Sequence, residues 1–598
     1  MSQVNDFAFK IATVNGTGSA SANTLLMTSI FRMGIPVTGK NIFPSNIQGL
    51  PTWYEIRVSG DGWNARRAQI DLVVAMNPET YKKDIASVTA GGYLIYDSSW
   101  PLPADLVRED ITILGVPCGK MCVEAFERDR DRVLLRNIVY AGAVAALLDI
   151  DMNVVDELLK ETYGRKPKLL DANHTAVRLG YDYTRANLQC PLPIRLERLD
   201  KTKDCILIDG NTAFGLGAVF AGATVGGWYP ITPSTAMMDA FANFCKKYRT
   251  TPDGEKNYIV IQAEDELAAA GIVIGANWAG ARAFTSTSGP GISLMQEFIG
   301  LAYYAEIPSV FVNVQRTGPS TGMPTRTQQA DLFSCAYASH GDTKHICLYP
   351  SDPKELFDMA PVAFDLAERF QTPVFVLSDL DIGMNDWMVP KFTWNDGYVP
   401  DRGNMLTADD VEKLGKWGRY QDTGGGIPSR TLPGSGGKGA YFTRGSGHNL
   451  NAAYTEDSAE YRAVVDRIAL KFTTAAGEVP RAVIEKAPGG SDIGIIAIGS
   501  TNGAVREAID RLAKQGVSCD YCRIRAFPFG ADVVEFLESH EKVFVVEQNR
   551  DAQLRSMIGI ETGTPFSKMI SVLDYGGLPL VPRVVVDAVV AQMAGVQQ

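Results

Sequence analysis

Short apolar runs of strand length alternate with helical stretches along most of the chain, and this alternation constrains the fold more than any other feature. The runs occupy residues 7–14, 70–76, 92–96, 111–116, 258–262, 282–286, 309–314, 373–377, 493–498 and 543–547. Apolar strands separated by helices are typical of parallel sheets with crossover helices. We therefore predict an α/β protein built from three doubly wound domains.

The same alternation sets the expected domain boundaries within the 598 residues. We predict α/β domains over residues 1–190, 204–395 and 489–598. Residues 396–488 break the pattern, because they are rich in Gly and Pro and contain one clear helical stretch at 459–472. An irregular connector of this length is unusual inside a compact domain and is often functional.

The composition argues against several classes of protein. Lys and Arg number 57 against 68 Asp and Glu, and the resulting net charge of −11 is unfavourable for binding a nucleic-acid backbone. The nine cysteines are scattered and odd in number, unlike a secreted disulfide framework. No apolar run reaches the ~18 residues of a membrane span, and residues 1–10 lack the pattern of a signal peptide. We expect a cytoplasmic protein without a membrane or nucleic-acid partner.

The most specific stretch is a proline-containing loop that follows the start of the second domain. It reads Tyr229-Pro230-Ile231-Thr232-Pro233-Ser234-Thr235. The two prolines fix the backbone on either side of Thr232, which presents its hydroxyl group. Ser234 and Thr235 are expected to cap a helix that begins near Met237, and a helix N-terminus beside a fixed hydroxyl suits an anion such as a carboxylate. The alternative is a turn that only caps the helix.

Three acidic residues, Glu264, Asp265 and Glu266, lie between a predicted strand and a predicted helix. Ligands of parallel sheets bind at the carboxyl ends of the strands, where these residues are placed. The alternative is that they only complement the dipole at the helix N-terminus, which each of them suits equally well. Position alone therefore does not select one of the three.

A small-residue turn also joins a strand to a helix, at Thr287-Ser288-Gly289-Pro290-Gly291. Residues this small let the backbone approach a ligand closely. The alternative is an ordinary tight turn, and the motif alone favours that alternative.

Arg316 directly follows another predicted strand, in the segment Gln315-Arg-Thr-Gly-Pro-Ser-Thr-Gly322. Its guanidinium could bind a carboxylate through two parallel hydrogen bonds. The alternative is a surface arginine that pairs with Asp or Glu. Arg326 and Asp331 lie nearby in sequence and could supply structure or contacts.

Taken in this order, the four motifs resemble those of the α subunits of the 2-oxoacid:ferredoxin oxidoreductases. The whole pattern is most similar to 2-oxoglutarate:ferredoxin oxidoreductase α subunits that carry a fused γ domain at the N-terminus. The resemblance covers all three blocks and is strongest over residues 205–335. It implies a γ domain, a thiamine pyrimidine-binding domain and a transketolase C-terminal-like domain, in that order.

The resemblance also implies an activity. Enzymes of this family use thiamine diphosphate and coenzyme A to decarboxylate a 2-oxoacid oxidatively, here 2-oxoglutarate to succinyl-CoA, CO₂ and reduced ferredoxin, or run the reverse reductive carboxylation. The alternatives are a preference for pyruvate or another 2-oxoacid, a different thiamine enzyme, and a non-catalytic scaffold subunit that keeps only the fold.

Site residues follow from the resemblance by position. Glu266 matches the carboxylate that bonds N1′ of the aminopyrimidine, with Glu264 as the alternative, and Thr232 and Arg316 match the residues that hold the carboxylate of the 2-oxoacid. The implied cofactor contacts are Tyr229, Pro230, Ile231, Glu266, Ser288 and Gly289. Glu547 and Asn549 are assigned to the coenzyme A side, with strand capping as the alternative.

Two parts of a complete thiamine enzyme are missing from the sequence. The Mg²⁺ that holds a diphosphate needs oxygen ligands, and the only Gly-Asp-Gly, at Gly60–Gly62, lies in the first domain. The only Cys-x-x-Cys pair is Cys519 and Cys522, which lies in an apolar strand pattern and suits packing better than a cluster. We therefore expect no metal site here, and a β subunit that brings Mg²⁺ and a [4Fe-4S] cluster, in an (αβ)₂ assembly served by ferredoxin.

Two segments depart from the family pattern. The first strand is followed by Gly16-Thr-Gly-Ser-Ala-Ser21 in place of Gly-x-Gly-Gly-Gln-Gly, and this leaves a phosphate site and a plain turn as open alternatives. In the connector, the run around His448 is less acidic than in relatives. A role for Arg444 or His448 stays open.

Overall fold

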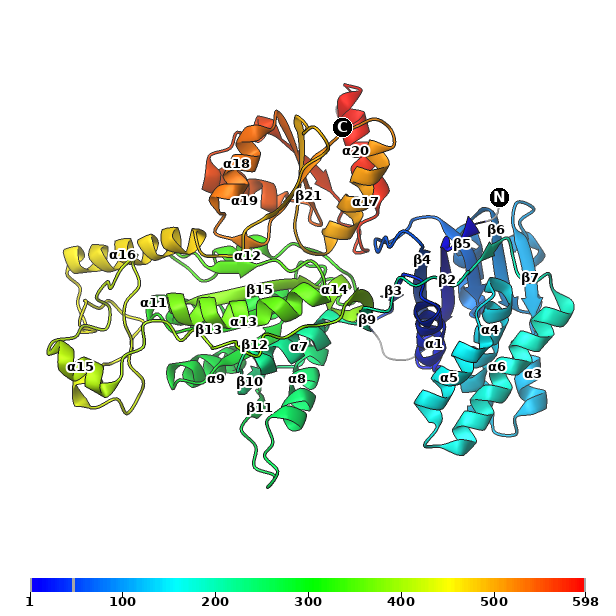
Figure 1. The fold of residues 1–598 in the computed structure, drawn as a ribbon, viewed down its shortest axis with the longest axis horizontal. Coiled ribbons are helices and arrows are strands. Elements are labelled where there is room, and N and C mark those ends of the chain that lie inside the picture. Colours follow the sequence, from blue (N-terminus) through cyan, green and yellow to red (C-terminus); the bar gives the residue numbers. More distant parts are fainter. Residues whose placement is uncertain (1–2, 46–48, 596–598) are drawn as a thin grey trace. The chain divides into compact units, whose positions relative to one another are not determined.

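The computed structural model describes residues 3–45 and 49–595. It divides into two compact units, residues 1–208 with 385–391 (unit 1) and residues 209–384 with 392–598 (unit 2). The predicted α/β class is confirmed, because parallel pairing dominates the main sheets of both units (Figure 1). Within the described residues, no helix has both the length and the apolar character needed to cross a membrane.

Unit 1 is built on a six-stranded sheet in which parallel and antiparallel pairs are combined. In sheet order its strands are β3 (Val37–Ile42), β4 (Pro51–Ser59), β2 (Asp6–Val14), β5 (Ile70–Ala75), β6 (Val88–Asp97) and β7 (Thr112–Val116). The strands expected from the sequence, β2 and β5 to β7, pair in parallel. β3 and β4 were not expected, and they pair antiparallel at the other side of β2.

Helices cover both faces of this sheet. Five of them pack on one face: α1 (Ser19–Arg32), α3 (Cys118–Ala125), α4 (Asp129–Leu148), α5 (Met152–Tyr163) and α6 (Pro167–Asn187). The short α2 (Tyr81–Ala86) packs on the other face. Two further pairs belong to unit 1, namely β1 (Gln3–Val4) with β8 (Ile194–Arg195), and β9 (Cys205–Ile208) with β16 (Trp387–Pro390). The strand read as the start of the second block, β9, therefore pairs within unit 1.

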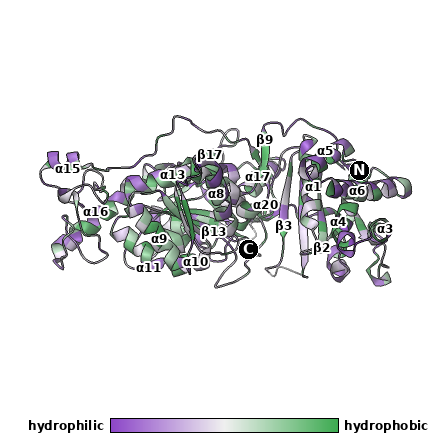
Figure 2. Ribbon diagram, turned by 90° about the horizontal axis from the view of Figure 1, so that it is seen from below, coloured by the Kyte–Doolittle hydropathy of each residue, from purple (hydrophilic) through white to green (hydrophobic). Residues whose placement is uncertain are grey.

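Unit 2 contains a seven-stranded sheet. In sheet order its strands are β11 (Ile259–Gln262), β10 (Val225–Trp228), β12 (Ala283–Thr287), β13 (Ser309–Gln315), β15 (Pro373–Asp379), β14 (Ile346–Leu348) and β20 (Ala526–Phe527). All pairs are parallel except that of β14 with β20. Every residue of β13 and β15 is buried, as expected for parallel strands covered on both faces. Figure 2 shows the apolar character of β13 and the neighbouring α9 in green.

The helices of this sheet connect its parallel strands. They are α7 (Gly210–Phe220), α8 (Thr235–Tyr248), α9 (Glu266–Trp278), α10 (Gly289–Leu294), α11 (Gln296–Tyr304), α12 (Leu332–Ala336), α13 (Pro353–Phe370) and α14 (Leu380–Met384). Helices α10 and α11 meet at Met295. β10 was not predicted, since its sequence is short and holds two glycines.

The C-terminal block forms a smaller sheet in the same unit. In sheet order its strands are β17 (Val483–Glu485), β19 (Asp520–Arg523), β18 (Ile493–Ala497), β21 (Lys542–Glu547) and β22 (Met569–Leu573). Its helices are α17 (Asn502–Ala513), α18 (Ala531–Ser539), α19 (Gln553–Thr562) and α20 (Pro582–Met593). β20 leaves this block to pair with β14, so the two sheets of unit 2 share a core. Cys519 and Cys522 are buried there.

The connector contains α15 (Ala408–Leu414) and α16 (Ser458–Ala476), the second of which was predicted from the sequence. A buried ion cluster holds α16 to the seven-stranded sheet. Glu306, which follows α11, accepts hydrogen bonds from Arg467 (3.1 Å) and Lys471 (2.8 Å) of α16. Glu306 is fully buried, so the hydrogen bonds from these two cations replace those that water would make to its carboxylate.

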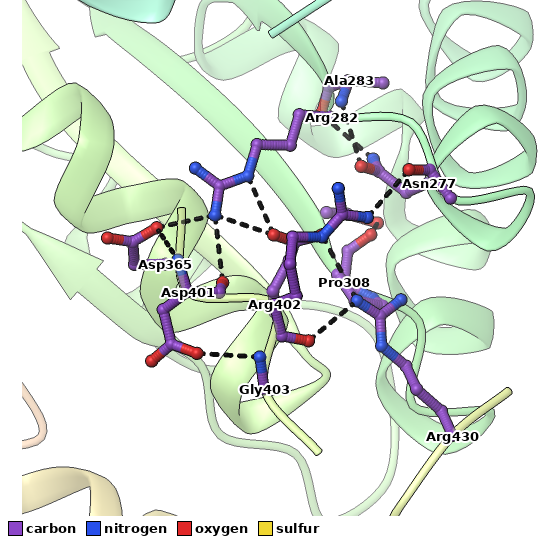
Figure 3. Close-up of polar contacts among 12 residues, drawn as sticks. Asn277, Arg282, Ala283, Pro308, Asp365, Asp401, Arg402, Gly403 and Arg430 are labelled. Carbon is purple, nitrogen blue, oxygen red and sulfur yellow. Dashed lines mark hydrogen bonds and ion pairs between the residues drawn. The ribbon is translucent and has the colours of Figure 1, made fainter. Parts of the chain in front are cut away.

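A second buried ion cluster fixes the irregular part of the connector at the amino end of β12 (Figure 3). Arg282 contacts Asp365 at 2.6 Å and Glu368 at 2.8 Å. Glu368 also contacts Arg402 (2.9 Å) and Arg430 (3.3 Å) of the connector. These contacts give the connector a structural role at the edge of the sheet opposite to the strand ends where ligands are expected.

We expect Glu306→Gln to lower the melting temperature by several degrees, because two buried cations lose their counter-charge. Removing one partner of a buried ion pair typically costs about 3–5 kcal/mol. The matched control is Glu412→Gln, which breaks an exposed pair with Lys438 and should cost no more than about 1 kcal/mol. Calorimetry of both variants measures the difference, and equal melting temperatures would contradict the argument.

Acid should remove the advantage of the wild-type chain over this variant. Burial alone would raise the pKa of Glu306, but Lys471 and Arg467 outweigh burial and lower the pKa from 4.5 to about 2. A carboxylate with a lowered pKa stabilises the fold above its unfolded pKa and loses that contribution as the pH falls toward its folded pKa. The difference in melting temperature should therefore be full at neutral pH and shrink from pH 4.5 toward 2.

Candidate active site at the carboxyl edge of the seven-stranded sheet

The four sequence motifs meet at one edge of the seven-stranded sheet. They follow β10, β11, β12 and β13, which are consecutive neighbours in the order β11-β10-β12-β13. The pairs are parallel and their ends are in register, with Trp228 opposite Gln262 and Thr287 opposite Asn313. The carboxyl ends of parallel strands are where ligands bind in such sheets, so this edge is the candidate active site.

The proline loop after β10 is fixed by its neighbours. Asn211 donates to the carbonyl of Pro233 (2.8 Å), and Arg316 donates to the carbonyl of Thr232 (2.7 Å). The loop is thereby tied both to α7 and to the residue that follows β13, and Thr232 is half-buried beside Arg316. Tyr229 and Ile231 are half-buried as well, while Pro230 is exposed.

The capping predicted for this loop is wrong. Helix α8 begins at Thr235, and its N-cap Ser234 makes no side-chain bond to the first turn. The hydroxyl groups of Ser234 and Thr235 instead donate to the carbonyl of Ile231, each at 3.2 Å. Both hydroxyls therefore stiffen the loop, an option open to Ser and Thr wherever a backbone carbonyl lies within reach.

The structure separates the three acidic residues after β11. Glu264 is exposed, and Asp265 caps α9 by accepting from the backbone N–H of Ala268 at 2.6 Å. The side chain of Glu266 is buried, with 6% of the residue exposed. Among residues 3–45 and 49–595, its carboxylate has no hydrogen-bond or ion-pair partner. Glu266 is therefore the one of the three that is both buried and free to bind a ligand.

Gly291 provides the space that the Glu266 side chain occupies. A Cβ atom at position 291 would lie 1.9 Å from Thr287 Oγ1 and 2.9 Å from Glu266 Cγ. No side chain fits there without moving Glu266 or the end of β12. The small-residue turn after β12 thus shapes the position of the buried carboxylate.

Ser288 and Gly289 form the rest of this turn. Ser288 is fully buried, and its hydroxyl oxygen has no partner among the described residues. A Cβ atom at Gly289 would lie 2.7 Å from Asp331 Oδ2, so the Asp331 carboxylate packs directly against the glycine. A contact of either residue with the cofactor stays a prediction.

Asp331 joins the site, although the sequence offered it only as a source of structure or contacts. Its Oδ2 atom accepts from Asn313 at 3.0 Å. Burial raises the pKa of Asp331, against the opposing effects of that hydrogen bond and of the Arg316 charge. No spacing or motif marks this residue, because it follows Arg316 through a long loop.

Arg316 interacts electrostatically with both carboxylates. It is 9% exposed, and burial lowers the pKa of its guanidinium while the charges of Asp331 and Glu266 raise it. Nη1 donates a hydrogen bond to the carbonyl of Thr232. Nε is buried and has no partner in the described part of the chain. A buried unpaired donor is costly, so this guanidinium suits a bound anion.

Glu547 and Asn549 lie at the end of β21 and are fully buried. Glu547 accepts from the backbone N–H groups of Leu554 (2.8 Å) and Arg555 (3.2 Å), at the start of α19. Asn549 donates to Glu547 at 2.6 Å. Glu547 thus binds the first turn of a helix, which differs from the strand capping considered as the alternative, and the contact with coenzyme A stays a prediction.

The remaining candidates belong to unit 1 and to the connector. In unit 1, Gly16 and Gly18 both have positive φ and precede α1, and a phosphate site there stays a prediction. In the connector, the ring of His448 stacks on Tyr420 with 4.0 Å between the ring centres. Burial lowers the pKa of His448. The guanidinium of Arg444 lies 4.8 Å from the ring centre of Phe442, so both connector residues make packing contacts.

Among the described residues, no group of three or more His, Cys, Asp or Glu side chains is arranged to hold a metal ion. Among the described residues, the carboxyl edge offers a buried carboxylate, a guanidinium N–H and a hydroxyl group without protein partners.

Family models match most of the chain. The model described as pyruvate flavodoxin/ferredoxin oxidoreductase, thiamine diphosphate-binding, matches residues 216–390, which include the candidate site. The model of pyruvate ferredoxin/flavodoxin oxidoreductase matches residues 8–183, and that of pyruvate:ferredoxin oxidoreductase core domain II matches residues 491–576.

Known proteins match over longer stretches. The 2-oxoglutarate synthase subunit KorA of Methanocaldococcus jannaschii is 35% identical over 57% of this chain and 88% of its own length. The 2-oxoacid:ferredoxin oxidoreductase 2 subunit alpha of Aeropyrum pernix is 29% identical over 98% and 97%. A solved 2-oxoglutarate:ferredoxin oxidoreductase from Magnetococcus marinus, with 2-oxoglutarate, coenzyme A and succinyl-CoA bound, is 29% identical, covers 99% of this chain and 100% of its own, and has a TM-score of 0.89. The chain belongs to the α subunits of the 2-oxoacid:ferredoxin oxidoreductases.

Proposed function

We propose that the chain is the α subunit of a 2-oxoglutarate:ferredoxin oxidoreductase, which converts 2-oxoglutarate and coenzyme A to succinyl-CoA and CO₂ and passes two electrons to ferredoxin. The same enzyme can run in reverse as a reductive carboxylase. The observation that carries the proposal is the buried, unpartnered Glu266 beside Arg316 at the carboxyl edge of the sheet. The names of the M. jannaschii and M. marinus relatives support 2-oxoglutarate as the substrate.

The residues at this edge fit the pyrimidine half of thiamine diphosphate and not its diphosphate half. When bound, thiamine diphosphate supplies the nucleophilic carbon and the electron sink for loss of CO₂ from a 2-oxoacid. The free Glu266 carboxylate matches the N–H that a protonated N1′ atom presents, and the loop and turn at Tyr229–Ile231 and Ser288–Gly289 supply the walls. Mg²⁺ and the diphosphate need several oxygen ligands together, and the described residues hold no group of three or more His, Cys, Asp or Glu side chains that could bind a metal ion, so we expect a partner chain to supply these ligands.

Glu266 holds a proton at one atom of the cofactor. With thiamine diphosphate bound, its carboxylate oxygen would accept a hydrogen bond from N1′ and hold a proton there, which would favour the imino tautomer of the pyrimidine, whose exocyclic nitrogen is a base. Burial strengthens this bond, because no water competes for the carboxylate. Because Gly291 has no side chain, the Glu266 side chain can occupy this position.

Arg316 and Thr232 bind the carboxylate of the 2-oxoacid. The free Nε atom of Arg316 can donate to one carboxylate oxygen, and the bond from Arg316 Nη1 to the Thr232 carbonyl keeps the two residues next to each other. Hydrogen bonds from a charged group to a carboxylate are about twice as strong as neutral ones. The pair therefore orients the keto carbon relative to Glu266.

The parts that this chain does not supply define its partners. We expect a β subunit that carries Mg²⁺, the diphosphate loop and a [4Fe-4S] cluster, assembled with this chain as (αβ)₂ in the cytoplasm. Ferredoxin is the expected electron acceptor, and coenzyme A the acyl acceptor.

Purification of the natively assembled complex tests the function. We expect a smaller second chain, bound iron, and viologen reduction that needs thiamine diphosphate, coenzyme A and a 2-oxoacid, with a higher kcat/KM for 2-oxoglutarate than for pyruvate. A preference for pyruvate would place the chain with another member of the same family. An iron-free chain that stays inactive after addition of β subunits would refute the oxidoreductase and favour a scaffold.

A further inference from the structure

Hydrogen bonds join the C-terminal block to residues 329–333, the segment that contains Asp331. The bonds join Gln329 N to Gln548 O (2.9 Å), Asn549 Nδ2 to Gln329 O (3.0 Å), Gln553 Nε2 to Ala330 O (2.8 Å), Leu332 N to Gln553 Oε1 (3.1 Å) and Phe333 N to Gln553 Oε1 (3.3 Å). The contacts lie on both sides of Asp331. Figure 1 shows α12, which follows Asp331, next to α19, which begins with Gln553.

Gln553 caps the N-terminus of α12 in place of Asp331. Asp331 is the N-cap residue of α12, but its side chain makes no bond to the first turn. An N-cap Asp usually accepts from the second or third N–H of its helix. Here the carboxamide oxygen of Gln553 accepts from Leu332 and Phe333 instead. The Asp331 carboxylate is thereby released from capping.

The released carboxylate turns to the candidate site. It accepts from Asn313 at 3.0 Å, packs against Gly289, and is the strongest counter-charge that Arg316 has. Arg316 has a second anionic neighbour, Glu266, whose carboxylate the proposed function needs free. The Asp331 charge acts on the same guanidinium and therefore competes with Glu266 for it.

We propose that Gln553 is a positioning residue, which caps α12 from the C-terminal block and so holds the Asp331 carboxylate beside Arg316. The inference rests on the proposed function for its effect on the substrate. When Gln553 loses its bonds, Asp331 turns back to cap α12, Arg316 moves toward Glu266, and fewer donors remain for the 2-oxoacid carboxylate.

The test uses the assembled complex with Gln553→Leu, which keeps most of the volume and removes the three side-chain bonds. We expect the KM for the 2-oxoacid to rise about tenfold, the worth of one hydrogen bond to a charged group, and the KM for coenzyme A to stay unchanged. Gln553→Glu keeps both bonds accepted by the side chain and should hold the KM within about threefold. Gln515→Leu, an exposed position of the same block, is the matched control. An unchanged KM with a lower kcat would overturn the proposal, because a loss of folded enzyme has that signature.

A double-mutant cycle of Gln553 and Asp331 tests whether Gln553 acts on the KM through Asp331 or through a general loss of packing. Asp331→Ala alone should raise the same KM, and adding Gln553→Leu should raise it no further, because the two residues act in one chain of contacts. Additive effects, or an unchanged KM in Asp331→Ala, would overturn the proposal.

Hydrogen exchange gives a readout that does not depend on activity. Peptides covering residues 327–336 should exchange faster in Gln553→Leu than in the wild-type complex, while peptides of α17 stay unchanged. Equal exchange at 327–336 would overturn the capping role. An inactive wild-type complex would instead refute the proposed function, and the exchange result would still decide the role of Gln553.

Discussion

Glu266→Gln is expected to lower kcat of the assembled complex about 10²- to 10⁴-fold, the usual worth of a positioned acid–base group. The amide matches the carboxylate in shape, but it is neutral and holds a proton at N1′ far less well. Because the Glu266 carboxylate has no hydrogen-bond partner among the described residues, the substitution breaks no bond there, and the melting temperature should change little. Steady-state viologen reduction, together with calorimetry, measures both effects.

Glu264→Gln is the matched control, since it makes the same chemical change two residues earlier on an exposed side chain. It should leave kcat within about twofold, as most surface substitutions do. If Glu264→Gln lost activity and Glu266→Gln did not, the assignment of the carboxylate would be wrong. If both variants kept full activity, the scaffold reading would gain support.

The strands that could be predicted are those whose sequence is a continuous apolar run. β13 and β15 are buried along their whole length, so every position is selected for burial and the run is unbroken. β4 was missed because its buried positions include charged residues. Glu55 is buried through its pair with Arg66 at 2.7 Å, and Arg57 through a bond to the carbonyl of Ala65 at 2.7 Å. Tertiary partners that sequence patterns do not reveal make these positions tolerable.

The candidate site was only partly visible for a related reason. Motifs at strand ends could be located, because the carboxyl ends of parallel strands share one edge. The choice among Glu264, Asp265 and Glu266 depends on burial, which only the packing of α9 against Gly291 decides. Asp331 was not predicted as a site residue at all, because the bond from Leu332 to Gln553 that frees it spans 221 positions in sequence.

Arg316→Lys is expected to lower kcat/KM about 10- to 100-fold for every 2-oxoacid, mainly through a higher KM. The change keeps the charge but removes the fork, so that a lysine cannot bond the Thr232 carbonyl and a substrate carboxylate in the same geometry. The expected loss is that of one hydrogen bond to a charged group, about 1.5–3 kcal/mol. The KM for coenzyme A should not change, since the substitution acts on the 2-oxoacid alone.

A comparison of two substrates makes this prediction specific to the carboxylate beside the keto group. 2-Oxoglutarate and pyruvate share that carboxylate, and only 2-oxoglutarate has a second one at its far end. If Arg316 binds the shared group, kcat/KM should fall by the same factor for both substrates and their ratio should stay constant. A loss of kcat/KM confined to 2-oxoglutarate would mean that Arg316 binds the far carboxylate. The Thr232–Arg316 pair would then not orient the keto carbon. Equal losses would instead place the shared carboxylate at Arg316 and Thr232, where the Asp331 charge competes with Glu266 for the guanidinium.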